Sequence, residues 1–577
     1  MPARWCTREP DPEAVRLVAR GAGLPDVVAR LLVTRGHADG PAAERHLQAS
    51  PMTLHDPFLL PGMGAATARL ARAVRDGETI LVHGDYDVDG VTGTALLMRL
   101  FALVGARAVW HIPNRLVDGY SFGEHSVRRA AETGAKVVIS VDNGTSAHAV
   151  IAALRARGVD TVVTDHHEAA PGPLPEAAAI VNPKLPGSTY PWRELCGGAV
   201  AFKLAWGLAQ ELSGQKRVTA ELRAFLEDAL AYVAVATVCD VVPLLDENRV
   251  FARAGLRALS ITRNPGLKAL LGICGLQGRR LAADDVGYQV GPRINASGRL
   301  GSAQRAVDLL LSEDDETACG LAAELDALNE RRKEIESAVL AEARVQATDY
   351  ADAEEHPVLV LAGEGWHQGV VGIVAARLVE EFHRPALVIG LDGPLGRGSA
   401  RTAPGFIVLE ALRGGAAHML RFGGHAQAAG CEVLPERVED LRRSVCAAAR
   451  AQMGPGPGRG EPELWIDAEL GFDAVTPELM AWVDRLEPFG EGNPEPVFSA
   501  RDLRLAEPAR VVGRDNGHLL LHLRRGEHVR KAMAFRLAGR AGELRMGVPL
   551  HAVFSPRWNT FRGETNLELV LHDFRAG

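Results

Sequence analysis

The chain of 577 residues is too long for one hydrophobic core, and common domain sizes indicate roughly three or four units. With 47% apolar and 24% charged residues, the composition is that of an ordinary globular protein. No apolar run follows the charged start and none reaches about 18 residues, so we expect neither a signal peptide nor a membrane span. The seven scattered cysteines form no CxxC pair, which argues against a disulfide framework or a zinc knuckle and fits the cytoplasm.

The net charge of −8 argues by itself against a nucleic-acid partner, but the charge is unevenly distributed. From Val497 to Gly577 there are 14 Lys or Arg and 8 Asp or Glu, an excess of six positive charges, so the remainder carries −14. An acidic body with a basic C-terminal region suits a metal-carboxylate enzyme that holds a polyanion elsewhere. Ordinary surface variation explains the charge alone equally well.

Short β-rich runs alternate with helical periodicity from about Thr79 to Val242. Ile80–Val82 is followed by a helical pattern over Val91–Leu103. Lys136–Val141 and Thr161–Thr164 are two further apolar runs, each followed by a turn and a helical stretch. This alternation predicts a mostly parallel sheet with helices on both faces.

The rest of the chain divides into a long helix, a second α/β region and a group of short strands. About Ser312 to Val345 is polar, lacks proline and predicts one extended helix that links two bodies. Pro357 to Arg450 predicts the second α/β unit, with strands at 358–361 and 386–389. Gly454–Gly458 marks a linker. Five short strands then predict a small barrel, most simply an OB-fold: 509–512, 519–523, 529–535, 549–554 and 565–571.

Acids and imidazoles follow three of the predicted strands. Asp85, Asp87 and Asp89 come after the first, Asp142 after the second, and Asp165–His167 after the third. Because ligands of open α/β sheets bind at the carboxyl ends of the strands, we expect these side chains to share one rim. Like charges this close need a cation to neutralise them.

Carboxylates with imidazoles suit Mn²⁺ or Mg²⁺, and a two-ion site needs a bridging and a closing carboxylate. Asp142 arrives alone from a central strand and is the bridging candidate, whereas Asp240 ends an apolar helix and would close the site. The Asp85–Asp89 spacing also resembles a calcium loop, but the twelfth position is Leu96 instead of Glu. A lone Asp142 is more often a helix N-cap, so the prediction rests on the whole set.

Several motifs follow one another in a fixed order. They are His83–Gly90, Asp142, Asp165–His167, Asp240, Gly291–Arg299, Gly398–Arg401, Gly423–His425 and Trp558–Gly563. The first four match the motifs of the DHH phosphoesterase superfamily. The two Gly-containing segments at 398–401 and 423–425 look like its companion domain, DHHA1. The remaining two resemble the RecJ exonuclease branch, and the resemblance covers nearly the whole chain.

The resemblance implies an α/β fold: a parallel-sheet DHH domain, a long helix, a smaller α/β DHHA1 domain and a C-terminal OB-fold barrel. We expect boundaries at 1–308, 309–350, 351–453 and 461–577, the first including an N-terminal extension. The implied activity is 5′→3′ degradation of single-stranded DNA to 5′-mononucleotides by two-metal phosphodiester hydrolysis, in DNA repair and recombination. The implied cofactor is Mn²⁺ or Mg²⁺, as two ions.

The resemblance also implies roles for individual residues. The catalytic set is Asp85, Asp87, Asp89, Asp142, His166, His167 and Asp240. The metal ligands among them are Asp87, Asp89, Asp142, His166 and Asp240, with His83 and Asp85 as further candidates. His167 is expected to contact the scissile phosphate.

A second group of residues is expected to contact DNA. Arg293 and Arg299 would bind the 5′-terminal phosphate through bidentate contacts. The other expected phosphate or base contacts are Arg115, Tyr120, Ser399, Arg401, Gly424, His425, Trp558, Phe561 and Arg562. Tyr120 would stack on a base or exclude the second strand, and the residues near Trp558 would lie at a hairpin tip.

Two other functions remain open. A phosphodiesterase of oligoribonucleotides or cyclic dinucleotides belongs to the same superfamily, but such relatives are shorter and lack the barrel; a pyrophosphatase would not need the basic C-terminal region. A non-catalytic single-strand-binding scaffold would be expected to lose some of the acids first. The expected partners are single-stranded DNA, a single-strand-binding protein and a repair helicase, and no membrane.

Overall fold

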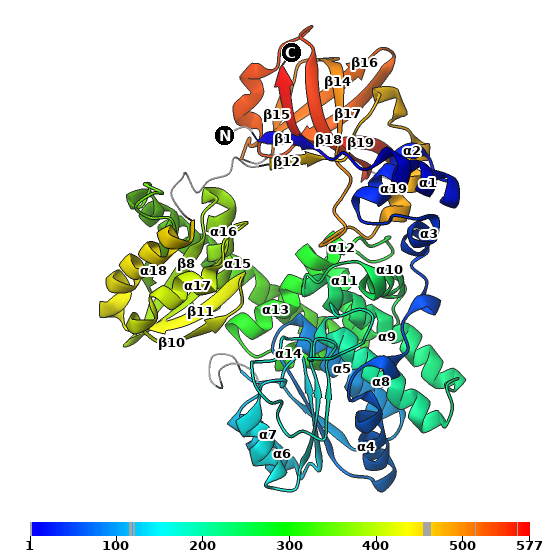
Figure 1. Ribbon diagram of the computed structural model, residues 1–577, viewed down its shortest axis with the longest axis vertical. Coiled ribbons are helices and arrows are strands. Elements are labelled where there is room, and N and C mark those ends of the chain that lie inside the picture. The colour runs from blue at the N-terminus through cyan, green and yellow to red at the C-terminus, as the bar shows by residue number, and fades with distance from the viewer. Residues whose placement is uncertain are drawn as a thin grey trace. The chain divides into compact units, whose positions relative to one another are not determined.

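The computed structural model describes residues 3–114, 118, 122–453, 463–513, 515–561 and 564–576, which form two compact units (Figure 1). The first unit holds Met1–Gly291, Val307–Cys319 and Pro462–Gly577. The second holds Pro292–Ala306 and Gly320–Glu461. Both ends of the chain therefore belong to the first unit, while the domain boundaries expected from the sequence stay a prediction.

A fully parallel five-stranded sheet forms the centre of the first unit, in the order β3-β2-β4-β5-β6. The strands are β2 (Ile80–Gly84), β3 (Ala108–His111), β4 (Val137–Val141), β5 (Asp160–Thr164) and β6 (Ala179–Val181). β2 and β4 are buried along their whole length, as is typical of strands covered on both faces. The parallel sheet predicted from the β–α alternation is confirmed.

Helices cover both faces of this sheet (Figure 1). They are α4 (Met63–Asp76), α5 (Val88–Leu103), α6 (Glu124–Thr133), α7 (His148–Arg155) and α8 (Gly197–Ser213). Leu81, Val138 and Val163 form one core with the apolar residues of α6 and α7. On the other side of the sheet, helix α8 contacts both α4 and α5. The ends of the strands are thereby held at fixed positions.

Further helices continue the chain beyond the sheet. They are α9 (Ala220–Cys239), α10 (Asp246–Ser260), α11 (Pro265–Ile273), α12 (Ala283–Asp285), a π-helix (Val286–Val290), α13 (Gly291–Leu300) and α14 (Gln304–Leu311). The predicted long helix is α15 (Asp315–Asp349), so it begins and ends a few residues later than the predicted 312–345. Among the described residues, no helix has both the length and the apolar character that crossing a membrane requires.

The C-terminal part of the first unit is a seven-stranded sheet in the order β13-β14-β18-β19-β17-β16-β15. Because β14 also pairs with β16, the five strands from β14 to β16 in this order close into a barrel. The strands are β13 (Ala468–Glu469), β14 (Phe498–Leu505), β15 (Arg510–Val512), β16 (His518–Arg525), β17 (His528–Ala534), β18 (Leu550–Phe561) and β19 (Glu564–Ala576). The short helix α19 (Pro477–Leu486) precedes β14. The predicted barrel is confirmed, and β14 is a strand that the sequence did not indicate.

The N-terminal segment packs against the barrel. Strand β1 (Arg4–Thr7) pairs in parallel with β12 (Glu463–Ile466), and Figure 1 shows the two side by side. The segment continues as α1 (Pro12–Ala22), α2 (Asp26–Thr34) and α3 (Gly40–Gln48). Val28 and Leu32 share one core with Phe472 and Phe498 of the barrel region. The two ends of the chain thus fold together, which the sequence did not indicate.

The second unit is a smaller α/β body with a mixed sheet in the order β10-β11-β9-β8-β7 (Figure 1). The strands are β7 (Leu359–Glu364), β8 (Ala386–Asp392), β9 (Leu395–Arg401), β10 (Met419–Gly424) and β11 (Ala428–Val433). The helices are α16 (Val371–Phe382), α17 (Val408–Gly414) and α18 (Val438–Met453). Separate cores form with α17 and α18 on one face and with α15 and α16 on the other. The expected Gly454–Gly458 linker lies outside the described residues.

Candidate metal centre

The carboxyl ends of three neighbouring strands bring the predicted acids together. Gly84 of β2 pairs with Val141 of β4, and Val141 pairs with Thr164 of β5, so the three strands end at one level. The acids directly after these strands must therefore lie side by side at one rim. We call Asp85, Asp87, Asp89, Asp142 and Asp240, with His166, the acidic group.

The imidazole of His166 lies at the centre of the acidic group. Its Nε2 is 3.1 Å from Asp142 Oδ1, 3.8 Å from Asp89 Oδ2 and 3.7 Å from Asp240 Oδ2. Asp240 reaches the others from the C-terminal end of α9, on which it is the capping residue. Asp89, Asp142 and His166 are buried, and the Asp240 side chain is about one-quarter exposed at 24%. Three carboxylates from three other segments of the chain thus converge on one nitrogen of His166.

Asp89 is held by the N-terminus of α8. The backbone N–H groups of Gly197 and Gly198 each donate a 2.6 Å hydrogen bond to one of its two carboxylate oxygens. A Cβ on Gly197 would lie 2.6 Å from Asp142 Cβ, and one on Gly198 would lie 2.7 Å from Ala236 Cβ. Only glycine permits this close approach. The sequence did not predict a role for either glycine. The pattern that could have indicated one is a Gly-Gly pair at the start of an apolar helix.

Asp142 has a backbone conformation that is uncommon for a residue other than glycine. Its φ is 65°, in the left-handed region, and its N–H donates to Thr164 O at 2.9 Å. Such strain is retained mainly where the surroundings dictate it, and it is concentrated at functional sites. Asp142 does not serve as an N-cap, because the N-cap position of the next helix, α7, is Ala147. The strained turn instead directs the Asp142 side chain toward His166.

Asp85 and Asp87 complete the acidic group from the turn after β2. Asp87 caps α5, because its Oδ1 accepts from the N–H groups of Asp89 and Gly90 at 3.0 and 3.1 Å. Asp85 Oδ1 accepts from Tyr86 N–H at 2.8 Å. The pKa of Asp142 is raised mainly by burial, and the negative charges of Asp85 and Asp87 raise it further.

His167 faces the acidic group as a cation that Asp165 positions. The Asp165 carboxylate accepts from His167 Nδ1 at 2.8 Å and from the backbone N–H groups of Thr145, His166 and His167. Burial lowers the pKa of His167, but the hydrogen bond to Asp165 and its charge outweigh burial and raise the pKa to about 9. His167 Nδ1 lies 3.9 Å from Asp142 Oδ1, and the side chain is about half exposed. Asp165 is an orienting residue; the sequence placed it at the same rim but gave it no role of its own.

The electrostatics of the acidic group fit a divalent cation. Burial is the largest cause that raises the pKa of Asp89, Asp142 and Asp240, and the neighbouring carboxylates raise it further. Burial lowers the pKa of His166 to about 4, so its ring is neutral and has a lone pair to offer. Asp142 Oδ1, Asp240 Oδ2 and both ring nitrogens of His166 are buried without a hydrogen-bond partner. Oxygen and nitrogen donors in this state are those that Mn²⁺ or Mg²⁺ would satisfy.

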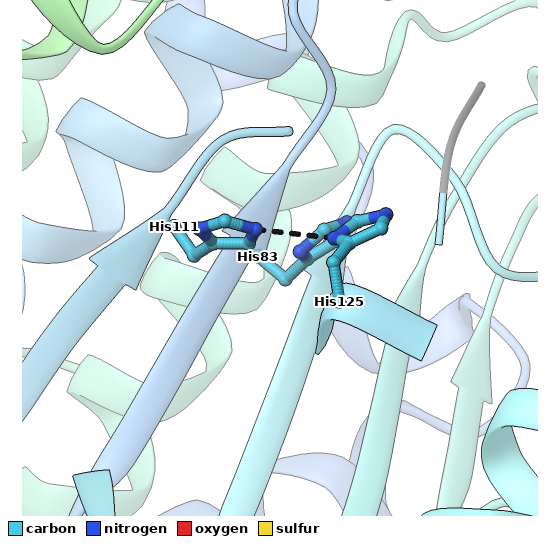
Figure 2. Close-up of side chains that lie close together, drawn as sticks. All are labelled: His83, His111 and His125. Carbon is cyan, nitrogen blue, oxygen red and sulfur yellow. Dashed lines mark hydrogen bonds between the residues drawn. The ribbon is translucent and has the colours of Figure 1, made fainter. Parts of the chain in front are cut away.

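His83 lies in a different cluster from the acidic group. It is fully buried, and its neighbours are His111 and His125, which Figure 2 shows around it. The donor triads of the acidic group are Asp142 with His166 and His167, and Asp89 with His166 and Asp240. The structure thus brings together the acids and His166 but places His83 among other histidines.

The residues expected to bind phosphate at the 5′ end lie in the second unit. Arg293 donates to Asp326 at 2.8 Å, and Arg299 donates to the carbonyl of Gly369 at 3.2 Å. Arg401 donates to Ser399 Oγ at 2.9 Å on β9. Gly424 ends β10 and His425 follows it, with its N–H donating to Ala428 O. These residues are therefore positioned by hydrogen bonds within their own unit.

Arg401 also lines a pocket of the second unit. The pocket has a volume of about 760 Å³. Thr402, Phe406 and Gln427 line it together with Arg401. A guanidinium beside a hydroxyl and an amide in a concave site is an arrangement suited to an anion.

The remaining predicted DNA contacts are Arg115, Tyr120, Trp558, Phe561 and Arg562. Trp558 lies on β18 of the β18–β19 hairpin, is 38% exposed and donates from Nε1 to Asp484 Oδ2 at 3.3 Å. Arg115, Tyr120 and Arg562 lie outside the described residues, as does the side chain of Phe561, although its backbone ends β18. The hairpin predicted around Trp558 is present.

Three protein-family models match separate parts of the chain. The DHH family N-terminal domain matches residues 79–236, the DHHA1 domain 355–451 and the RecJ OB domain 466–573. The single-stranded-DNA-specific exonuclease RecJ of Dickeya dadantii is 35% identical over 563 residues, which cover 95% of this chain and 96% of that protein. The chain belongs to the RecJ family. The RecJ protein of Bacillus subtilis is 36% identical over 548 residues, covering 94% of this chain and 67% of that protein.

RecJ structures share the fold over almost the whole chain. The crystal structure of RecJ from Thermus thermophilus in complex with Mn²⁺ has a TM-score of 0.82 at 31% identity, covering 99% of this chain and 79% of that one. Its complex with Mg²⁺ has a TM-score of 0.77 at 29% identity, covering 99% and 78%. The DHH, DHHA1 and barrel parts expected from the sequence are therefore those of RecJ. Both metals that the acidic group fits occur in RecJ structures.

Proposed function

We propose that this RecJ family member is a metal-dependent exonuclease that degrades single-stranded DNA from the 5′ end to 5′-mononucleotides. The observation that carries the proposal is the convergence of Asp89, Asp142 and Asp240 on His166 Nε2 within 3.1 to 3.8 Å. The RecJ relatives are named single-stranded-DNA-specific exonucleases, and solved RecJ structures contain Mn²⁺ or Mg²⁺. Hydrolysis of phosphodiester bonds is the chemistry that such a centre performs.

The proposed ligands of two divalent ions are Asp87, Asp89, Asp142, His166 and Asp240. When bound, the ions would neutralise charge on the scissile phosphate and activate the attacking water. The amides of Gly197 and Gly198 fix both oxygens of Asp89, and the left-handed turn at Asp142 fixes the other central carboxylate. Neutral His166 offers a nitrogen lone pair between them. The chain thus orients its donors before any substrate arrives.

His167 is proposed to hold the scissile phosphate. With a pKa of about 9, its imidazole is protonated at neutral pH and can donate to a phosphate oxygen. Asp165 fixes the ring through Nδ1, so Nε2 would be the nitrogen that donates to the phosphate. Because Asp165 also accepts from three backbone N–H groups, the loop after β5 cannot turn the ring away without losing several hydrogen bonds.

The polarity of degradation is tested with single-stranded oligonucleotides labelled at either end. With Mn²⁺ or Mg²⁺, we expect labelled mononucleotide to appear early from 5′-labelled DNA and late from 3′-labelled DNA, with duplex DNA left intact. Early release from the 3′ label would refute the proposed direction. Hydrolysis of dinucleotides without cleavage of long DNA would place the protein among small-substrate phosphodiesterases, and inactivity on both would leave a binding scaffold.

We further propose that Arg293 and Arg299 recognise the terminal 5′-phosphate, helped by Ser399, Arg401, Gly424 and His425. Arg293→Ala and Arg299→Ala should each erase the preference for 5′-phosphorylated over 5′-hydroxyl DNA. Arg305→Ala is the matched control, because Arg305 is exposed and pairs with Glu324 of the same unit. An unchanged preference in the first two variants would reject the assignment.

The proposed setting is DNA repair and recombination in the cytoplasm. A single-strand-binding protein and a repair helicase are the proposed protein partners. These proposals are supported by family membership, whereas the basic C-terminal barrel and the RecJ OB match support the single-stranded DNA itself as substrate.

A further inference from the structure

Three histidines from three elements meet at one edge of the central sheet. His83 lies on β2, His111 on β3 and His125 in the first turn of α6 (Figure 2). His83 and His111 are direct partners in the parallel β2–β3 pairing, so the register of the strands fixes their proximity. One nitrogen of each ring lies within 4.8 Å of the other two, and His111 Nε2 is 3.1 Å from His125 Nδ1.

We propose that His83, His111 and His125 bind one divalent transition-metal ion, such as Zn²⁺, Co²⁺ or Ni²⁺, separately from the acidic group. Ligand nitrogens around a tetrahedral ion with bonds of 2.0–2.1 Å lie about 3.3 Å apart. The His111–His125 nitrogen separation is close to this value. Imidazole donors favour these ions over Mg²⁺, which the carboxylates of the acidic group suit better.

The surroundings of the histidines support a cation. His83 is fully buried, and its Nε2 has no hydrogen-bond partner. Burial and the neighbouring His125 lower the pKa of His111 to about 4, so its ring is neutral and can act as a ligand. The charges of Asp118 and Glu132 raise the pKa of His111, whereas the charge of Arg129 lowers it.

The position of the three histidines at the edge of the sheet determines how an ion would reach them and what its binding would stabilise. β3 is an edge strand, and His111 is only half-buried, so an ion can enter from that side. A bound ion would tie β2 to β3 and to the start of α6. Since β2 leads directly into Asp85 and Asp87, the ion would stabilise the strand end on which the acidic group is built.

The number and chemistry of bound ions are measured with Co²⁺ on the full-length protein. The Asp142→Asn variant serves as the background because it weakens the acidic group. We expect one Co²⁺ with the visible absorption of nitrogen ligation, and the loss of one bound ion when His111→Phe or His125→Phe is added. His148→Phe is the matched control, because His148 is an exposed histidine on α7. Unchanged stoichiometry and affinity in the two cluster variants would overturn the proposal.

A second measurement needs no substitution at the cluster. Wild-type crystals soaked in Zn²⁺ and measured at the zinc absorption edge should show an anomalous peak within bonding distance of His111 and His125. A peak only at the acidic group, or no peak at all, would overturn the proposal. Because this experiment uses the wild-type protein, it tests the proposal even if the phenylalanine variants do not fold.

Discussion

Both oxygens of Asp89 accept hydrogen bonds from the start of α8, so a helix more than 100 residues away in the sequence orients this carboxylate. The same turn of α8 touches Asp142, which a Cβ on Gly197 would meet at 2.6 Å. Backbone N–H groups at a helix N-terminus favour negative charge. They therefore offset part of the cost of burying an acid beside other acids.

Replacing Gly198 should damage the centre without unfolding the protein. A Cβ there would lie 2.7 Å from Ala236 Cβ and 3.0 Å from Asp89 Oδ1, so the amide donors must shift. Because displacements of about 1 Å at a reacting centre cost about 100-fold in rate, Gly198→Ala should lower kcat by about that factor. Gly207→Ala on the same helix would meet Met63 Sδ and Thr67 Cγ2, each at 3.1 Å, instead of Asp89, and should keep its rate. Equal rates for the two variants would contradict this role of Gly198.

The sequence predicted the acids but not what holds them. The sequence indicated Asp87, Asp142 and Asp240 because a carboxylate shortly after an apolar run is a typical metal ligand at the end of a strand or helix. The contact of Gly198 with Asp89 could not be predicted, since a glycine at a helix start has many uses and its partner lies far away in the chain. The meeting of His111 with His83 likewise depends on strand register, which no local pattern gives.

The β18–β19 hairpin continues beyond the pairings of β18 with β14 and of β19 with β17, and Trp558 lies on this extended part. Predicted strands end where apolar alternation ends, so the sequence indicated only 549–554, whereas β18 continues to Phe561. Strand β14 was missed for a related reason. A register shift between Ala500 and Leu503 breaks the two-residue period that marks a strand.

Trp558→Ala should weaken DNA binding more than it slows hydrolysis. Stacking of one base on an aromatic ring contributes about 1–3 kcal/mol, so the Kd for a single-stranded oligonucleotide should rise roughly 5- to 150-fold. Fluorescence anisotropy over a range of salt concentrations measures it. Trp465→Ala is the control, since Trp465 is also exposed but lies on β12 against Arg8. Undiminished affinity and an unchanged salt slope would rule out stacking at Trp558.

Arg249 connects three parts of the first unit. Its guanidinium is buried and donates to the carbonyls of His46, Arg485, Leu486 and Glu487. It therefore joins α3, α10 and the end of α19. The sequence showed the separate α/β and barrel regions because each has its own periodicity. It could not show this junction, because an arginine on a helix is usually predicted to lie at the surface.

Acid should weaken this junction because the buried His46 and the partly buried His37 lie beside Arg249. Burial, then the charge of Arg249, lowers the pKa of His46 from 6.5 to about 2 and that of His37 to about 4. Arg35 and Arg253 also face His46 and lower its pKa. The unfolded chain binds protons below pH 6.5 while the folded protein does not. The stabilisation of the folded protein by these two neutral histidines is therefore complete above pH 6.5. It is lost as the pH falls below 6.5, down to about 4 for His37 and about 2 for His46.

At pH 5, this effect of His46 amounts to about 2 kcal/mol. His46→Phe keeps an aromatic ring against His37 but binds no proton. Scanning calorimetry between pH 8 and pH 5 should therefore give a smaller decrease in Tm for the variant than for the wild type. Parallel decreases in the two proteins would mean that His46 does not cause the acid sensitivity.

The central claim is that the acidic group at the strand ends hydrolyses single-stranded DNA with bound metal ions. It is tested most directly by the release of mononucleotides from 5′-phosphorylated single-stranded DNA at saturating Mn²⁺, comparing the wild type with Asp142→Asn. Asp142 is buried at 3.1 Å from His166, and its carboxylate is central to the proposed site. We predict that the variant binds DNA normally but loses at least about 1,000-fold in turnover. Turnover within about tenfold of the wild type would contradict the account.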